Sequence, residues 1–138
     1  MQDASKVVMG ANLSTAKEVT SYKGAVLAGL VVRQKSDGTL SLAKADGGIL
    51  GVSLGNDLSN AGFCPIARKG LLIPVLLTAA FTPVVGAAVN ISDTTGKAAA
   101  AGAGVTAVNA IYASAVLQGL QEDGTYADVA LIDMAGGL

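Results

Sequence analysis

Short apolar runs separated by turn-forming residues make up most of this sequence from residue 23 onward. The run Ile49–Leu54 alternates with a period of two, which is typical of an extended segment with one buried face carrying Leu50, Val52 and Leu54. Similar runs follow at intervals, and turn signals such as Asp37-Gly38 stand between them. About eight to ten short strands of this kind predict an all-β fold, a small β-barrel or sandwich with at most one short helix.

The same order of signals occurs twice, which indicates a pseudo-duplicated β unit over about residues 23–77 and 82–134. Three pairs of segments carry the match: Leu27-Ala28-Gly29 with Val84-Val85-Gly86, Asp37-Gly38-Thr39 with Thr95-Gly96-Lys97, and Ile49–Leu54 with Ile111–Leu117. The second copy has an Ala/Gly-rich insert at 98–104. We expect a surface loop there, with a short helix as the alternative, because Gly102 and Gly104 would interrupt a helix.

Residues 1–22 differ from the single β domain expected over 23–138, because they are mostly polar around one short apolar patch, Val7-Val8-Met9. Two interpretations remain open for them. They form an ordinary first strand, or they form an arm that becomes ordered by adding a strand to a partner's sheet. The early acid and the absence of a long apolar core argue against a signal peptide.

The uncharged stretch Leu71–Val89 has the length of a membrane-spanning helix and follows the basic pair Arg68-Lys69. Its prolines, Pro74 and Pro83, and its β-branched residues favour strands instead. We therefore expect a strand over Phe63–Ala67, a turn at 68–70 and a second strand over Leu71–Leu77, with Pro74 at an edge or a bulge. A membrane-associated protein using Leu71–Val89 is the alternative.

Composition and charge both favour association with other chains. Apolar residues make up 51% of the 138 residues, charged residues 14%, and the mean hydropathy is +0.56, so a small monomer would expose much apolar surface. Up to Gly70 there are eight Lys/Arg and five Asp/Glu, and from Leu71 onward there are one and five. Such halves suit head-to-tail or ring-like self-association, although solvated charges with no partner explain them equally well. The net charge of −1 gives no reason to expect nucleic acid as a partner.

Two motifs resemble catalytic or nucleotide-binding sites. Ser14-Thr15-Ala16-Lys17 fits the S-x-x-K of serine acyl-enzymes, but the K-T-G strand is missing and Ser92-Asp93-Thr94 only approximates the S-D-N element. Gly102–Ala107 fits a loose G-x-G-x-x-A, but no βαβ unit surrounds it, so a flexible loop is expected. We predict that the protein is not an enzyme and that its surfaces do its work.

Metal and cofactor sites are not expected either. The chain has no histidine, its carboxylates stand singly in turns apart from Glu122-Asp123 at a hairpin tip, and it has one cysteine, Cys64. Cys64 lies in an apolar run, so we expect a buried small side chain in a reduced compartment rather than a nucleophile or half of a disulfide.

Over about residues 20–134 the sequence resembles the head decoration, or capsid cement, proteins of tailed bacteriophages. The resemblance is carried by the order of glycines and β-branched residues in these segments: Ile49-Leu50-Gly51-Val52, Ala61-Gly62, Lys69-Gly70, Gly86, Val89, Gly96, Ile111–Leu117, Asp123-Gly124 and Val129-Ala130-Leu131. The chain departs from this pattern at Ala113, where a glycine is expected, and in the alanine-rich insert.

The resemblance implies a structural virion protein that forms a homotrimer and binds the outer surface of an icosahedral phage head at threefold or quasi-threefold sites. Made in the host cytoplasm, it would bind the major capsid protein and bridge neighbouring subunits after the shell expands, with no membrane or nucleic-acid partner and no cofactor. The N-terminal arm would reach the capsid, and the residues expected to contact it are Lys6, Val7, Val8, Met9 and Leu13.

Overall fold

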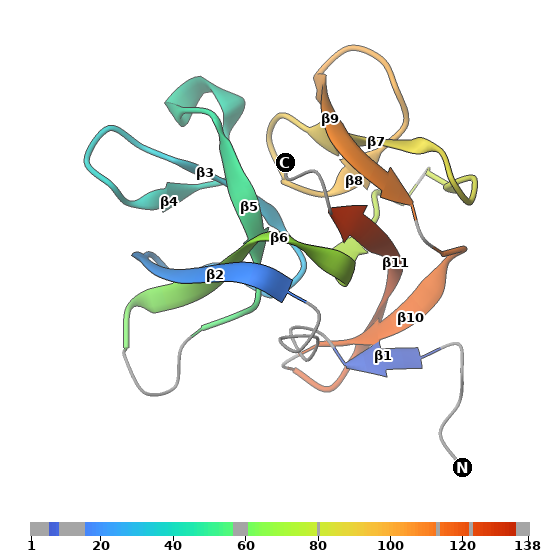
Figure 1. The fold of residues 1–138 in the computed structure, drawn as a ribbon, viewed down its shortest axis with the longest axis horizontal. Helices are drawn as coiled ribbons and strands as arrows, with labels where there is room; N and C mark the ends of the chain where they lie inside the picture. Colours follow the sequence, from blue (N-terminus) through green and yellow to red (C-terminus); the bar gives the residue numbers. More distant parts are fainter. Residues whose placement is uncertain are drawn as a thin grey trace.

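The chain is described here by a computed structural model that covers residues 6–8, 16–56, 61–79, 81–112, 114–121 and 123–134. These residues form eleven strands and one 3-10 turn, so the predicted all-β fold is confirmed (Figure 1). The elements are β1 (Lys6–Val8), β2 (Ala16–Lys23), β3 (Val31–Gln34), β4 (Leu40–Ser41), η1 (Lys44–Asp46), β5 (Ile49–Ser53), β6 (Phe63–Leu76), β7 (Ala88–Ser92), β8 (Ala98–Ala99), β9 (Val105–Tyr112), β10 (Leu117–Leu120) and β11 (Tyr126–Met134).

The strand order has the same pattern when read from either end. It runs β4-β3-β5-β6-β11-β9-β7-β8, so β6 and β11 pair at the centre and each half continues with the equivalent strands. Outside this path, β2 pairs with β6 and β10 pairs with β11. In Figure 1, β3, β4 and β5 lie on one side of the centre, and β7, β8 and β9 lie on the other. The strand order is thus pseudo-symmetric about the pair β6 and β11, and the duplicated unit stays a prediction.

One part of the predicted internal alignment is wrong. The counterpart of β5 in the strand order is β9 (Val105–Tyr112), and not the segment Ile111–Leu117. The alignment failed because it assumed a loop over the alanine-rich segment. Ala98 and Ala99 instead form β8, opposite Ile91 and Asn90, and both are buried. A glycine-containing turn at 101–104 then leads into β9, so neither a loop through 98–99 nor a helix forms there. Packing against β7 decides the conformation of these alanines, although alanine favours helices.

The turn predicted at 68–70 is also wrong, because β6 is one continuous strand of 14 residues. Its first part pairs with β2 and its last part with β11, and the register shifts near Gly70, where the partner changes. One bulged strand within a single sheet replaces the two separate strands expected from the sequence. Over 73–76 the paired strand is β11 alone, with Pro74 opposite Leu131, which fits the edge position that proline requires.

The stretch Leu71–Val89 contains the end of β6, a turn region and the beginning of β7. No helix in the described part of the chain is both long and apolar enough to span a membrane.

The core consists of two clusters that lie on opposite faces of the central strands. Val31 belongs to the first cluster and Val32 to the second, while Ala130 and Val129 of β11 divide in the same way. Because successive side chains of a strand point to opposite faces, both faces of these strands are covered. The first cluster includes residues from both halves of the chain, so the two halves share one core.

The expected common face for Leu50, Val52 and Leu54 is only partly correct. Val52 and Leu54 belong to the first cluster, whereas Leu50 packs against the second. The cause is an irregularity in the pairing of β3 with β5, where Val32 lies opposite Gly51 but Arg33 lies opposite Ile49. The extra residue in β5 is Leu50, and a bulge of this kind turns its side chain to the other face.

Gly96 illustrates how closely the halves approach each other. It has φ +72, its carbonyl oxygen accepts a hydrogen bond from the Val31 N–H at 2.8 Å, and an added Cβ would collide with the Val31 carbonyl oxygen. Gly124 has a similar φ of +84, but a Cβ there would have nothing within 4 Å.

We therefore expect Gly96→Ala to lower the free energy of unfolding by at least about 2 kcal/mol, because it adds a backbone collision to the left-handed strain. Gly124→Ala is the matched control and should cost about 1 kcal/mol, since it introduces the strain alone. Urea denaturation of both variants measures the difference. Equal losses would show that the contact between Gly96 and Val31 is not tight.

Candidate functional site

The predicted capsid-contact residues lie partly in β1. Lys6, Val7 and Val8 form this strand, which pairs in parallel with β10, while Met9 and Leu13 lie outside the described residues. β2 pairs antiparallel with β6. Both N-terminal strands thus join the sheet of their own chain in this structure. Contact of this segment with a capsid protein stays a prediction.

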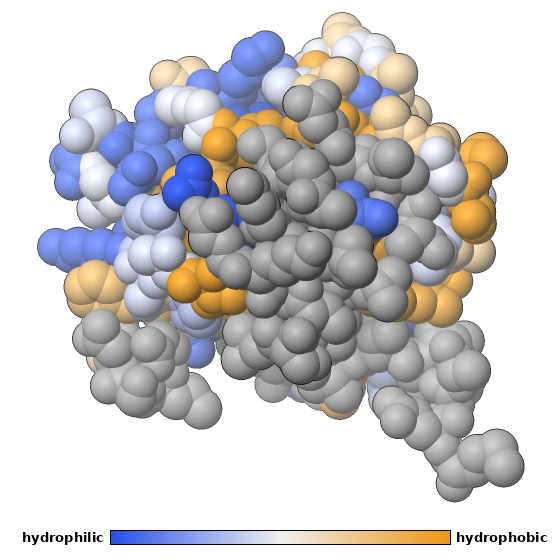
Figure 2. All heavy atoms as spheres, in the orientation of Figure 1, coloured by the Kyte–Doolittle hydropathy of each residue, from blue (hydrophilic) through white to orange (hydrophobic). Residues whose placement is uncertain are grey.

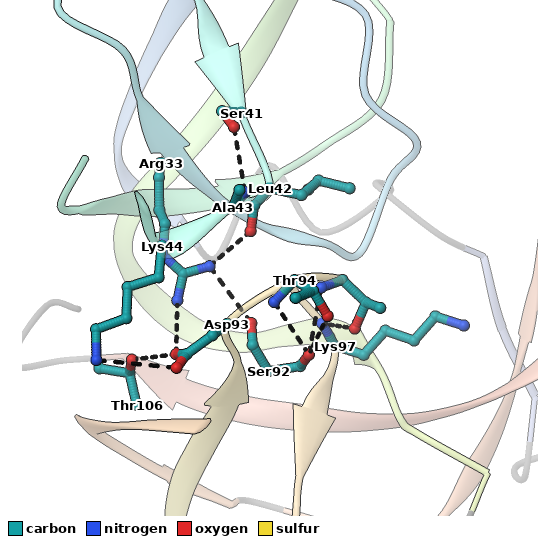
Figure 3. A network of polar contacts seen from close by, with 11 residues as sticks. Arg33, Ser41, Leu42, Ala43, Lys44, Ser92, Asp93, Thr94, Lys97 and Thr106 are labelled. Atoms are coloured by element: carbon teal, nitrogen blue, oxygen red, sulfur yellow. Dashed lines mark hydrogen bonds and ion pairs between the residues drawn. The ribbon is translucent and has the colours of Figure 1, made fainter. Parts of the chain in front are cut away.

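A buried arginine at the junction of the two halves is the centre of the main polar cluster (Figure 3). Arg33, on β3, is 1% exposed. Its Nη1 donates to the Leu42 carbonyl oxygen at 2.7 Å and to the Ser92 carbonyl oxygen at 3.3 Å. Leu42 belongs to the first half of the chain and Ser92 to the second, so one guanidinium group connects the two halves.

Asp93 completes this cluster from the second half. Its Oδ1 lies 3.6 Å from Arg33 Nη2 and accepts a hydrogen bond from Thr106 Oγ1 at 2.6 Å. Its Oδ2 lies 3.8 Å from Lys44 Nζ, and its carbonyl oxygen accepts the Lys44 backbone N–H at 2.8 Å. The first turn after β7 is therefore attached to η1 of the other half by both side-chain and backbone contacts.

The cluster has two cations, Arg33 and Lys44, and one carboxylate, Asp93. Burial lowers the pKa of Arg33 from its ordinary value, and the negative charge of Asp93 acts in the opposite direction. A guanidinium group stays protonated in either case, so Arg33 keeps its positive charge. Its Nη2, 3.6 Å from Asp93, has no hydrogen-bond partner among the described residues. Asp93 is occupied by three donors or cations, which suits it to holding the halves together rather than to moving protons.

Ser92-Asp93-Thr94, which approximates a catalytic S-D-N element in sequence, has a local structural role. Ser92 Oγ accepts hydrogen bonds from the backbone N–H groups of Thr94 at 3.3 Å and Thr95 at 3.2 Å. This arrangement stabilises the turn between β7 and β8. Ser14, the proposed partner in S-x-x-K, lies outside the described residues, so that motif stays untested.

Cys64 is fully buried in the second core cluster, as predicted. Its sulfur accepts the Val26 N–H at 3.2 Å, and its thiol lies 3.2 Å from the Gly24 carbonyl oxygen. These contacts attach the segment after β2 to β6, which gives Cys64 a structural role.

The other two candidate chemistries find no support. Gly102 and Gly104 lie in a turn that leads into strand β9, and a dinucleotide loop would have to open a helix instead, so the match to G-x-G-x-x-A has no nucleotide-binding geometry. Within the described ranges, no group of three or more His, Cys, Asp or Glu side chains is placed to hold a metal ion.

Two hairpin tips carry the same side-chain arrangement, as their shared Asp-Gly-Thr sequence suggests. The Thr39 hydroxyl and backbone N–H donate to Asp37 Oδ1 at 2.6 and 3.0 Å, and Thr125 donates to Asp123 at the same distances. In each case the threonine side chain, followed by its N–H, holds the pKa of the aspartate below its ordinary value. These tips are polar and locally satisfied, which is usual for exposed turns.

The turn before β7 breaks this rule, and sequence reasoning missed it. Val84 and Val85 are 71% and 61% exposed, the highest values among the large hydrophobic side chains of the described residues. The signal was available, because Val84-Val85-Gly86 contains a turn glycine without a polar residue. Arg33 was missed as well, although a charged residue directly after the apolar run Val26–Val32 marks it.

A comparison with protein-family models and with curated proteins finds no match to this sequence. The functional interpretation therefore depends on the residues and surfaces described above.

Arg33→Met is expected to lower the free energy of unfolding by about 2–4 kcal/mol, because it leaves Asp93 and two carbonyl oxygens without their cation or donor. Lys44→Met removes the exposed member of the same cluster and should cost less than about 1 kcal/mol. Guanidinium chloride denaturation measures both. Similar small losses for the two variants would mean that the buried arginine does not hold the halves together.

Proposed function

We propose that this protein is a structural virion protein that decorates the outside of an icosahedral phage head. As a homotrimer it would bind the major capsid protein and act as cement that stabilises the expanded shell. The observation that carries the proposal is the combination of an all-β scaffold with exposed apolar side chains on a hydrogen-bonded turn, at Val84 and Val85. The resemblance in sequence pattern to head decoration proteins points in the same direction.

The composition supports a role based on surfaces. Half of the residues are apolar, and several large hydrophobic side chains outside the core are exposed, including Leu27 and Val19 of the first half. Exposed apolar positions on a folded domain commonly mark contacts with other proteins. Near the junction, Arg33 Nη1 and the carboxylate of Asp93 contact groups of both halves, so they stiffen the scaffold.

Linkage explains how such a protein would strengthen a shell. A ligand that binds the expanded lattice but not its dissociated subunits stabilises the lattice. The stabilisation grows with the ratio of the free ligand concentration to its Kd. A decoration protein that touches more than one capsid subunit adds this effect at every repeated site. Short N-terminal strands such as β1, which pair through backbone groups, provide one means of contact with an extended capsid segment.

The test uses purified expanded heads that lack decoration protein, and it compares the full chain with a variant lacking residues 1–13. The full chain should co-sediment with the heads and raise their temperature of disruption. The shortened variant should bind at least tenfold more weakly while keeping its oligomeric mass, because the arm and not the β domain reaches the capsid.

Two results would count against the proposal in different ways. Failure of the full chain to bind expanded heads would remove the decoration function altogether. Normal binding by the shortened variant would leave that function in place but would show that Lys6–Val8, Met9 and Leu13 do not contact the capsid.

A further inference from the structure

The turn that precedes β7 is well ordered by its own hydrogen bond and yet carries two exposed valines. The Ala87 N–H donates to the Val84 carbonyl oxygen at 3.0 Å, and Gly86 takes the left-handed conformation with φ +84. Figure 2 shows hydrophobic atoms at the right-hand edge of the molecule, where the chain enters β7 in Figure 1. The exposed hydrophobic side chains therefore stand on a defined turn.

The matching turn of the first half is covered in part by its own chain: Ala28 is buried there, whereas Leu27 is 50% exposed. Gly29 has φ +86 and precedes β3 as Gly86 precedes β7. The Gly29 N–H donates to the Ser53 carbonyl oxygen and its own carbonyl accepts the Leu76 N–H, both at 2.8 Å, while Ala28 is buried. The second half has Val85 in place of this alanine, with more apolar surface, in a position exposed to solvent. This difference indicates that another surface covers the second turn.

Charge points to a second copy of this chain as that surface. The first half carries the excess of Lys and Arg, and its exposed charged residues include Lys23, Lys35 and Lys44 together with Asp37 and Asp46. The second half carries the excess of acids, with Asp123 and Asp128 exposed. The two halves lie on opposite sides of the β6–β11 centre (Figure 1). A head-to-tail contact brings unlike charges together, whereas a twofold contact between two Val84–Val85 turns would bring acid against acid.

We propose that the Val84–Val85 turn is the apolar anchor of a head-to-tail contact, in which it packs against the basic first half of the next copy. That half exposes Leu27 (50%), and β2 exposes Val19 (39%), which provide apolar surface for the anchor. Two valines cover much less than the roughly 800 Å² per partner of a stable interface, so they serve as its centre and the surrounding surface supplies the rest. A head-to-tail contact closes into a ring when the rotation from one copy to the next is a whole-number fraction of a full turn.

The inference rests on the self-association that forms part of the proposed function, and it can be tested without a capsid. Light scattering on a dilution series measures the mass of the wild-type chain and of a Val84→Ser/Val85→Ser variant. The wild type should be a closed oligomer of the 13.5 kDa chain, and the variant should dissociate at concentrations at least tenfold higher. Tyr126→Ser, which removes another exposed hydrophobic side chain, should leave the mass unchanged.

Salt distinguishes the two possible arrangements. Raising NaCl from about 0.05 to about 0.5 M screens charge interactions and should weaken a head-to-tail contact between unlike halves. Tighter association at high salt would indicate that like halves meet, and it would overturn the proposal. A monomeric wild type, an unchanged oligomer in the double variant, or equal dissociation of the Tyr126→Ser control would overturn it too. Circular dichroism melting of each variant checks that the fold is retained.

Shell binding separates this inference from the function itself. If the double variant is monomeric and the wild-type oligomer does not bind heads, the contact is right and the decoration function is wrong. If the wild-type oligomer decorates heads and the two valine substitutions do not change its mass, the decoration function stands and the proposed contact is wrong.

Discussion

The pairing of β6 with β11 is the interaction on which the rest of this structure depends. Residues 73–76 of β6 lie opposite 129–132 of β11, and this ladder is the link between the strand order of the first half and that of the second. Its side chains contribute to both core clusters: Ile73 and Ile132 belong to one, and Leu76 and Val129 to the other. Separating the two strands would expose both clusters, so neither half keeps a complete core without its partner.

A second set of contacts, outside the ladder of β6 and β11, also holds the two halves together. Arg33 and Asp93 connect the halves through side chains, and Gly96 allows the turn after β7 to lie against Val31. A buried ion pair adds little net stability compared with apolar packing, but removing one member leaves the other unsatisfied. The cluster therefore fixes the geometry of the halves, while the free energy of folding comes mainly from the shared apolar core.

The exposed turns of this fold differ in polarity. The tips at Asp37 and Asp123 satisfy their own polar groups and need no partner. The tip at Val84 and Val85 leaves apolar surface in solvent. A domain whose halves differ in net charge and in one turn has unlike surfaces on its two sides. The proposed self-association depends on this difference.

Local features of this fold could be predicted from the sequence, and long-range ones could not. The all-β class, the buried Cys64 and the turns at Asp37-Gly38 and Asp123-Gly124 follow from residue types and their spacing. The continuity of β6 through Arg68-Lys69-Gly70 could not be predicted, because charged residues beside a glycine suggest a turn until the partner strands are known. The strand at Ala98–Ala99 depends on β7, and the tie between Arg33 and Asp93 joins residues far apart in the chain.

Native-state hydrogen exchange tests most directly whether the two halves form one cooperative unit through β6 and β11. The protected amides of β3 and β5 in the first half, and of β7 and β9 in the second, should exchange with one common free energy equal to that of global unfolding, because opening either half destroys the shared core. Exchange of one half at a clearly lower free energy, while the other half stays protected, would contradict this account.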